Sequence, residues 1–166
     1  MFDFKPDPAL DTAERYRQLC DAADALTSNE PDPVANMANV AALLWEFVPD
    51  LNWAGFYRMG VSVKGDGREL VLGPFVGRPA CIRIPIGQGV CGACAKDAVT
   101  QLVEDVHAFP GHIACDAASR SELVVPVIRD REVVAVIDLD SPSPARFDES
   151  DAAGVEALAE LLSSRI

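Results

Sequence analysis

The chain has 166 residues, of which 49% are hydrophobic, and a formal net charge of −12. This composition predicts a folded domain and disfavours binding to nucleic acid or an anionic membrane surface. No apolar run approaches the roughly 20 residues that span a bilayer, and the charged N-terminus lacks a signal-peptide core. We therefore expect a cytoplasmic protein whose five cysteines are reduced unless catalysis oxidises them.

The first fifty residues carry two helical patterns. Apolar positions recur in steps of three and four over residues 11–28, with Asp11 or Thr12 as the N-cap. The proline-containing segment 29–33 ends this pattern. A second apolar stripe predicts a helix over residues 34–47. Cys20 lies within the first helix, where we expect it to be inert.

The middle of the chain has the composition of strands, and one more helix closes it. Strands are predicted over residues 52–59, 69–76, 81–84, 101–104, 121–128 and 132–140. The last two are expected to form a hairpin, although no glycine marks its turn. A short helix is expected over residues 90–98 and a final one over residues 148–164. This order predicts an α+β fold with an antiparallel sheet.

Cysteines gather between residues 81 and 115, and their spacing leaves three interpretations open. Cys91 and Cys94 form a CxxC pair, which is typical of redox motifs. The same pair with His112 and Cys115 supplies four soft ligands for zinc. In the third interpretation Cys94 is a small apolar residue on the buried face of a short helix. Cys91 stands near a predicted helix start, where the helix dipole favours a thiolate.

Cys115 lies in the segment HAFPGHIACDAASRSE, residues 107–122. Glycine and proline interrupt the backbone there, so a packed helix is not expected around this thiol. A redox-active nucleophilic thiol needs a low pKa, access to its substrate and a second thiol that resolves it. The residues around Cys115, with Cys81, Cys91 and Cys94 earlier in the chain, are compatible with all three.

Two carboxylates end the apolar strand EVVAVIDLD, residues 132–140. Period-2 alternation places Asp138 and Asp140 on one face, where their repulsion is expected to let one of them hold a proton near neutral pH. Such a group suits the protonation of a departing oxygen. The alternative is a pair of solvated acids at the strand end. Trp53 and Tyr57 are expected in the core or in the wall of a pocket.

Several sequence blocks together resemble the free methionine-(R)-sulfoxide reductase family, whose members are GAF-domain enzymes. The blocks are NWAGFY (52–57), LVLGPFVGRPACIRIPIGQGVCGAC (70–94), VEDVHAFPGHIACDAASRSELVVPV (103–127), IDLDSP (137–142) and RFDESD (146–151). The resemblance implies a single GAF domain over residues 1–166 with about six antiparallel strands. Its helices would occupy residues 1–50, its sheet and active-site loops residues 51–147, and its C-terminal helix residues 148–166.

The resemblance also implies a reaction and a set of site residues. Cys115 matches the catalytic cysteine, while Cys91 and Cys81 match the two cysteines from which the resolving thiol is drawn, with Cys91 preferred. The positions that match the substrate pocket are Trp53, Tyr57, Glu122, Asp138 and Asp140. The implied activity is the reduction of free L-methionine (R)-S-oxide through a Cys115 sulfenic acid and an intramolecular disulfide. Thioredoxin is the implied reductant, with no metal or organic cofactor.

Two other functions are open at this point. One is a non-catalytic GAF sensor of a small molecule, since a GAF fold alone says little about chemistry. The other is a zinc-binding protein built on Cys91, Cys94, His112 and Cys115. Cys94 also departs from the family, in which a small residue without a thiol is expected. GAF domains often dimerise, and the sequence leaves a monomer and a homodimer both open.

Overall fold

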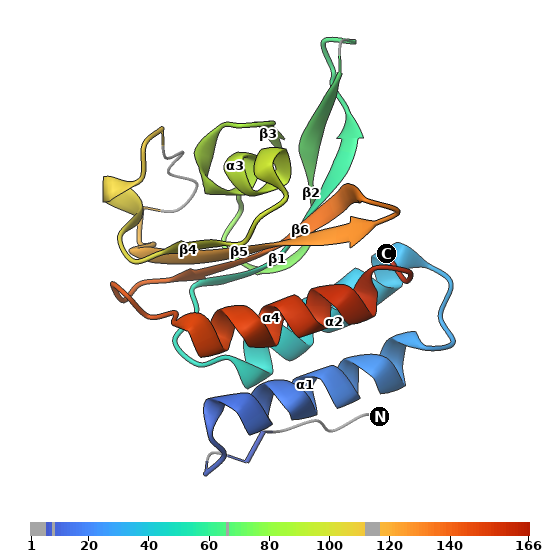
Figure 1. The fold of residues 1–166 in the computed structure, drawn as a ribbon, viewed down its shortest axis with the longest axis vertical. Coiled ribbons are helices and arrows are strands. Elements are labelled where there is room, and N and C mark those ends of the chain that lie inside the picture. The colour runs from blue at the N-terminus through green and yellow to red at the C-terminus, as the bar shows by residue number, and fades with distance from the viewer. Residues whose placement is uncertain (1–5, 8, 66, 112–116) are drawn as a thin grey trace.

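One antiparallel sheet with helices on both faces makes up the fold (Figure 1). The computed structural model describes residues 6–7, 9–65, 67–111 and 117–166. Its strands are β1 (Trp53–Val61), β2 (Arg68–Gly77), β3 (Arg83–Pro85), β4 (Gln101–Val103), β5 (Ser121–Arg129) and β6 (Glu132–Ser141), in the order β3-β2-β1-β6-β5-β4. Its helices are α1 (Thr12–Thr27), α2 (Pro33–Phe47), α3 (Gly89–Asp97) and α4 (Glu149–Leu162), with a 3-10 turn η1 (Val106–Ala108). The predicted α+β class and the six antiparallel strands are confirmed.

The two faces of the sheet carry separate hydrophobic cores. Helices α2 and α4 cover one face, and α1 lies outside them (Figure 1). The helix α3 covers the other face, where it packs on Trp53, Tyr57 and Val136. Alternation along β1 and β6 sends every second side chain to each core. Side chains of the same strand therefore enter different cores, as Phe56 and Tyr57 do on β1.

Aspartate side chains cap the starts of α1 and α4. Asp11 is the N-cap of α1 and accepts from the Glu14 backbone N–H at 2.8 Å, as the sequence predicts. Asp148 caps α4 in a capping box with Asp151. Asp151 also accepts a hydrogen bond of 2.9 Å from the hydroxyl of Tyr16 on α1. The start of α4 is thus tied to the outer helix.

The β5–β6 hairpin sets the register that the site depends on. Its two turn residues, Asp130 and Arg131, adopt φ values of 53° and 68° without a glycine. Positive φ at both turn positions matches the right-handed twist of the flanking strands. The hairpin is confirmed, but the predicted strand at residues 81–84 is shifted, because β3 begins at Arg83 and leaves Cys81 in the preceding loop. No helix among the described residues is long and apolar enough to cross a membrane.

A close approach of α1 and α4 gives a test of the packing. A methyl group added at Gly154 would overlap the ring of Tyr16. We expect Gly154→Ala to lower the free energy of unfolding by about 1–3 kcal/mol, although alanine ordinarily favours a helix over glycine. Urea denaturation measures this change. The exposed Ala153→Gly on the same helix is the control for helix propensity alone. A stabilised Gly154→Ala protein would contradict the packing described.

Candidate active site

The sheet register brings four predicted site residues together. Trp53 on β1 and Glu122 on β5 both lie opposite Asp140 on β6. Asp138 lies two residues earlier on β6, opposite Val124. Residues that lie opposite each other in an antiparallel sheet, and those two positions away along a strand, point to the same face. All four side chains therefore point toward α3.

The loop before α3 brings a thiol to this face. Gly87 and Gly89 take φ values of 85° and 63°, which bend the chain sharply into the helix. A side chain at Gly92 would stand 2.5 Å from the carbonyl oxygen of Pro85, so only glycine lets α3 lie this close to β3. Cys91 follows Gly89 by two residues and is 4% exposed. The CGAC sequence thus places its first cysteine over the sheet.

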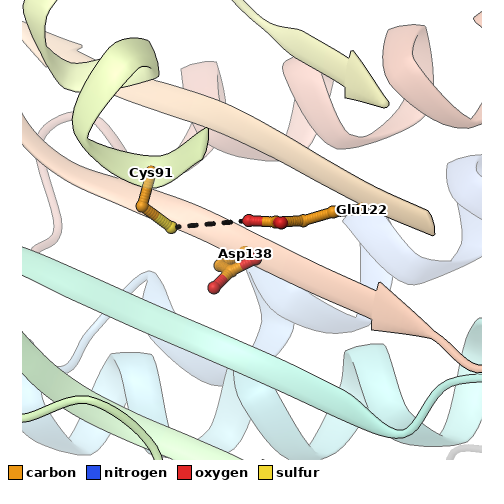
Figure 2. Close-up of side chains that lie close together, drawn as sticks. All are labelled: Cys91, Glu122 and Asp138. Carbon is orange, nitrogen blue, oxygen red and sulfur yellow. Dashed lines mark hydrogen bonds between the residues drawn. The ribbon is translucent and has the colours of Figure 1, made fainter. Parts of the chain in front are cut away.

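Cys91, Glu122 and Asp138 form a buried cluster (Figure 2). The thiol of Cys91 donates to Oε1 of Glu122 over 4.0 Å, and the carboxyl group of Asp138 lies beside both. Glu122 is 6% exposed and Asp138 is 5% exposed. The alternative of solvated acids at the strand end is therefore wrong for Asp138. Asp140 is only partly buried.

Burial dominates the protonation of the two acids. It raises the pKa of Asp138 to about 7, while hydrogen bonds from Cys91 and Glu122 act in the opposite direction. Burial also raises the pKa of Glu122 well above its ordinary value, and the charges of Asp138 and Asp140 raise it further. The prediction that one acid holds a proton near neutral pH is confirmed, but its main cause is burial rather than repulsion between Asp138 and Asp140.

The prediction of a thiolate at Cys91 is wrong. Burial and the neighbouring Asp138 and Glu122 raise the pKa of this thiol well above its ordinary value. These effects outweigh the helix dipole, although Cys91 lies in the first turn of α3, where the dipole favours a thiolate. Cys94 is fully buried, and its thiol donates to the Val124 carbonyl over 3.6 Å. The interpretation of Cys94 as a small packing residue is confirmed.

Aromatic rings form one wall next to the cluster. Trp53 stacks on Tyr57 with ring centroids 5.8 Å apart and on Phe75 at 5.2 Å. The indole N–H of Trp53 is buried and has no hydrogen-bond partner among the described residues. The hydroxyl of Tyr57 donates to the backbone carbonyl of Cys81 at 3.1 Å. Phe75 was not expected here, because its place beside Trp53 depends on the β1–β2 register.

The cysteines differ in their redox state. Cys81 is disulfide-bonded, whereas Cys20, Cys91 and Cys94 are free thiols. Cys115 and His112, which the sequence analysis singles out, lie outside the described residues. Among the residues that the structure describes, Cys91 groups with Glu122 and Asp138 in a potential metal site, and Cys94 is not part of that group. Of the four ligands of the predicted zinc site, Cys91 and Cys94 are described. Cys91 lies beside two carboxyl groups, whereas Cys94 lies against the backbone of β5.

Comparisons with known proteins match most of this chain. Residues 37–166 match the family model of the GAF domain. The chain is 49% identical to the protein YtsP of Bacillus subtilis, over 92% of this chain and 91% of that one. It is 44% identical to the free methionine-R-sulfoxide reductase of Escherichia coli, over 90% and 87% of the two chains. The crystal structure of the Neisseria meningitidis free methionine-R-sulfoxide reductase with its substrate aligns at a TM-score of 0.89 and 43% identity, covering 99% and 95%.

The buried acids predict an unusual dependence of stability on pH. Asp138 has an ordinary pKa of 3.8 and a folded pKa of about 7. Between these values the folded state holds a proton that the unfolded state has lost, so stability falls as the pH rises through this window. We expect Asp138→Asn to raise the free energy of unfolding by about 2–4 kcal/mol near pH 8, with the gain vanishing near pH 4.

Urea denaturation at several pH values measures this difference. Asp97→Asn removes an exposed carboxyl group on the same side of the sheet and is the matched control. We expect its effect to be small and independent of pH. If Asp138→Asn destabilises the protein equally from acidic to alkaline pH, burial does not govern the charge of Asp138.

Proposed function

The chain belongs to the family of free methionine-R-sulfoxide reductases, whose fold is the GAF domain, and on that premise we propose that it reduces free methionine-(R)-sulfoxide to methionine. The observation that carries this proposal is the buried acid pair Glu122 and Asp138 beside the stacked rings of Trp53 and Tyr57. These groups match a ligand with a positive charge at one end and a small apolar group at the other. Free methionine sulfoxide has both.

The acids provide a reason for selecting the free amino acid. In the proposed complex an ionised carboxylate of the cluster binds the substrate ammonium group, and the Trp53–Tyr57 wall contacts the methyl group. A methionine sulfoxide residue within a peptide chain has an amide in place of the ammonium group. The buried carboxylate would then lack its partner, at a cost of about 1–3 kcal/mol.

The same acids supply a proton to the reaction. Cys115 as thiolate attacks the sulfoxide sulfur, and a protonated carboxyl group of the cluster, whose pKa burial raises, protonates the sulfoxide oxygen. The resulting hydroxyl group moves to the sulfur of Cys115 as the S–O bond of the substrate and the transient S–S bond break. The products are methionine and Cys115 sulfenic acid, so the thiol is oxidised as the sulfoxide is reduced. We assign this role to Glu122 and Asp138 rather than to Asp140, because Asp140 is more exposed.

We assign the resolving thiol to Cys81 in place of Cys91. Cys81 is disulfide-bonded, and its backbone carbonyl accepts a hydrogen bond from the hydroxyl of Tyr57. Cys91 is a free thiol whose pKa burial raises, which makes it a poor nucleophile. In the proposed cycle the Cys81 thiol condenses with the Cys115 sulfenic acid, releases water and forms a disulfide. A dithiol reductant of the cytoplasm such as thioredoxin then restores both thiols by exchange.

Cysteine variants test this division of roles. We expect Cys115→Ser to form no methionine from the free (R)-sulfoxide. We expect Cys81→Ser to form about one methionine per chain and then to stop with thioredoxin as reductant, because its sulfenic acid has no resolving partner. Single-turnover and steady-state assays on the reduced protein separate the two steps.

Cys94→Ser is the matched control, because it removes a buried thiol that the proposed cycle does not use. Full single-turnover activity of Cys115→Ser would refute the nucleophile. The resolving role would belong to Cys91 if Cys81→Ser kept thioredoxin-dependent turnover and Cys91→Ser lost it.

Substrate selectivity tests the role of the carboxylates. We expect N-acetylmethionine (R)-sulfoxide to have a kcat/KM about 5- to 150-fold lower than that of the free amino acid, which corresponds to a cost of about 1–3 kcal/mol. Asp138→Asn is expected to narrow this ratio, whereas Asp97→Asn is expected to preserve it. Equal turnover of the free and acetylated substrates by the wild-type protein would rule out recognition of the ammonium group.

A further inference from the structure

The cluster of Cys91, Glu122 and Asp138 has the composition of a metal site. One ligand atom from each residue, a thiol sulfur and two carboxyl oxygens, lies within 4.8 Å of the other two. The three side chains come from α3, β5 and β6 and converge on one point (Figure 2). All three are buried. Because each comes from a different element of the packed core, folding itself brings the three donors together.

The spacing of the donors fits a small divalent ion. Zinc binds cysteine sulfur at about 2.3 Å and carboxylate oxygen at about 2.0–2.2 Å, so a tetrahedral ion holds these two atoms about 3.6 Å apart. Oε1 of Glu122 lies 4.0 Å from the sulfur of Cys91. A shift of a few tenths of an ångström would bring this pair of atoms to the separation that a tetrahedral ion requires.

A buried oxygen atom of Asp138 that has no hydrogen-bond partner in the described part of the chain is a second observation that points to a bound ion. Asp138 is 5% exposed, and its Oδ1 atom makes no hydrogen bond to any described residue. Buried carboxyl oxygens are ordinarily hydrogen-bonded or bound to a cation. The carboxyl group lies against Cys91 and Glu122 (Figure 2). The unpaired atom therefore belongs to the same group that offers the three donors.

We propose that Cys91, Glu122 and Asp138 bind one Zn²⁺ ion, which excludes the ammonium group of the substrate and so inhibits the reductase. One sulfur and two oxygen ligands favour zinc over Mg²⁺ or Ca²⁺, which prefer oxygen ligands alone. Three protein ligands leave the fourth position of a tetrahedral ion for water. This set shares only Cys91 with the four-ligand site predicted from cysteine spacing.

Competition follows from the shared carboxylates. A divalent ion bonded to Glu122 and Asp138 removes the negative charge that attracts the substrate ammonium group. Zinc also bonds to the sulfur of Cys91, a contact that an ammonium group does not replace. The inhibition rests on the proposed function, whereas the metal site itself does not.

Cobalt titration of the reduced protein tests the site directly. We expect one Co²⁺ per chain, with a thiolate-to-cobalt charge-transfer band and the visible absorption of a tetrahedral ion, and displacement by one equivalent of Zn²⁺. Cys91→Ser is expected to abolish the charge-transfer band, and Asp138→Asn to weaken zinc binding at least tenfold. Cys94→Ser and Cys115→Ser are the controls and are expected to bind like the wild type.

Each outcome decides the proposal. It is overturned if the wild-type protein binds no ion, if Asp138→Asn binds zinc as tightly as the wild type, or if Cys94→Ser or Cys115→Ser loses the ion. Circular dichroism and thermal melting establish that each variant is folded, and Asp138→Asn keeps the test valid should Cys91→Ser fail to fold.

Activity measurements separate this proposal from the proposed function. We expect Zn²⁺ to raise the KM for free methionine (R)-sulfoxide without changing kcat. A protein that binds zinc but does not reduce the sulfoxide would retain the metal site and refute the reductase. A protein that reduces the sulfoxide but binds no ion would refute the metal site alone.

Discussion

The structure depends on keeping two carboxyl groups side by side away from water. Glu122 and Asp138 are buried on neighbouring strands, in contact with a thiol that burial also holds in its neutral form. Isolated buried charges are costly, so the pair responds by retaining protons to higher pH. The packing of α3 over the sheet produces that response, because it excludes the water that would otherwise stabilise both charges.

The hydrophobic core on the opposite face of the sheet offsets the free-energy cost of burying the two acids. Helices α2 and α4 bury an apolar layer against it, and α1 is joined to α4 through Tyr16 and Asp151. Active sites commonly hold groups in environments that weaken the fold, and the surrounding core compensates. The division is visible within single strands, since on β6 the residues Ile137 and Leu139 enter the apolar core while Asp138, between them, enters the cluster.

Much of this architecture is predictable from local sequence, because caps and periodicity are local properties. Asp11 and the apolar steps that follow it define α1, and alternation identifies the faces of β6.

Register and burial depend on contacts between distant segments, so the sequence does not predict three features. They are the place of Phe75 beside Trp53, the shift of β3 away from Cys81, and the neutral thiol of Cys91. A helix start favours a thiolate only while water or a cation supports it, and here two acids face the sulfur. The family resemblance predicts the roles of Trp53, Tyr57 and the carboxylates. Cys115 lies outside the described residues.

Two buried acids resolve a conflict that one acid could not. Binding an ammonium group requires a negative charge, whereas helping the sulfoxide oxygen to leave requires a proton. A single carboxyl group with a pKa near neutrality would be in the wrong state for one of these tasks at any moment. Glu122 and Asp138 are coupled, and losing the first proton makes the second harder to lose. As the pH rises through about 7, Asp138 loses its proton while Glu122 keeps its own, and the pair then carries one charge and one proton together, which is the combination that the proposed reaction needs.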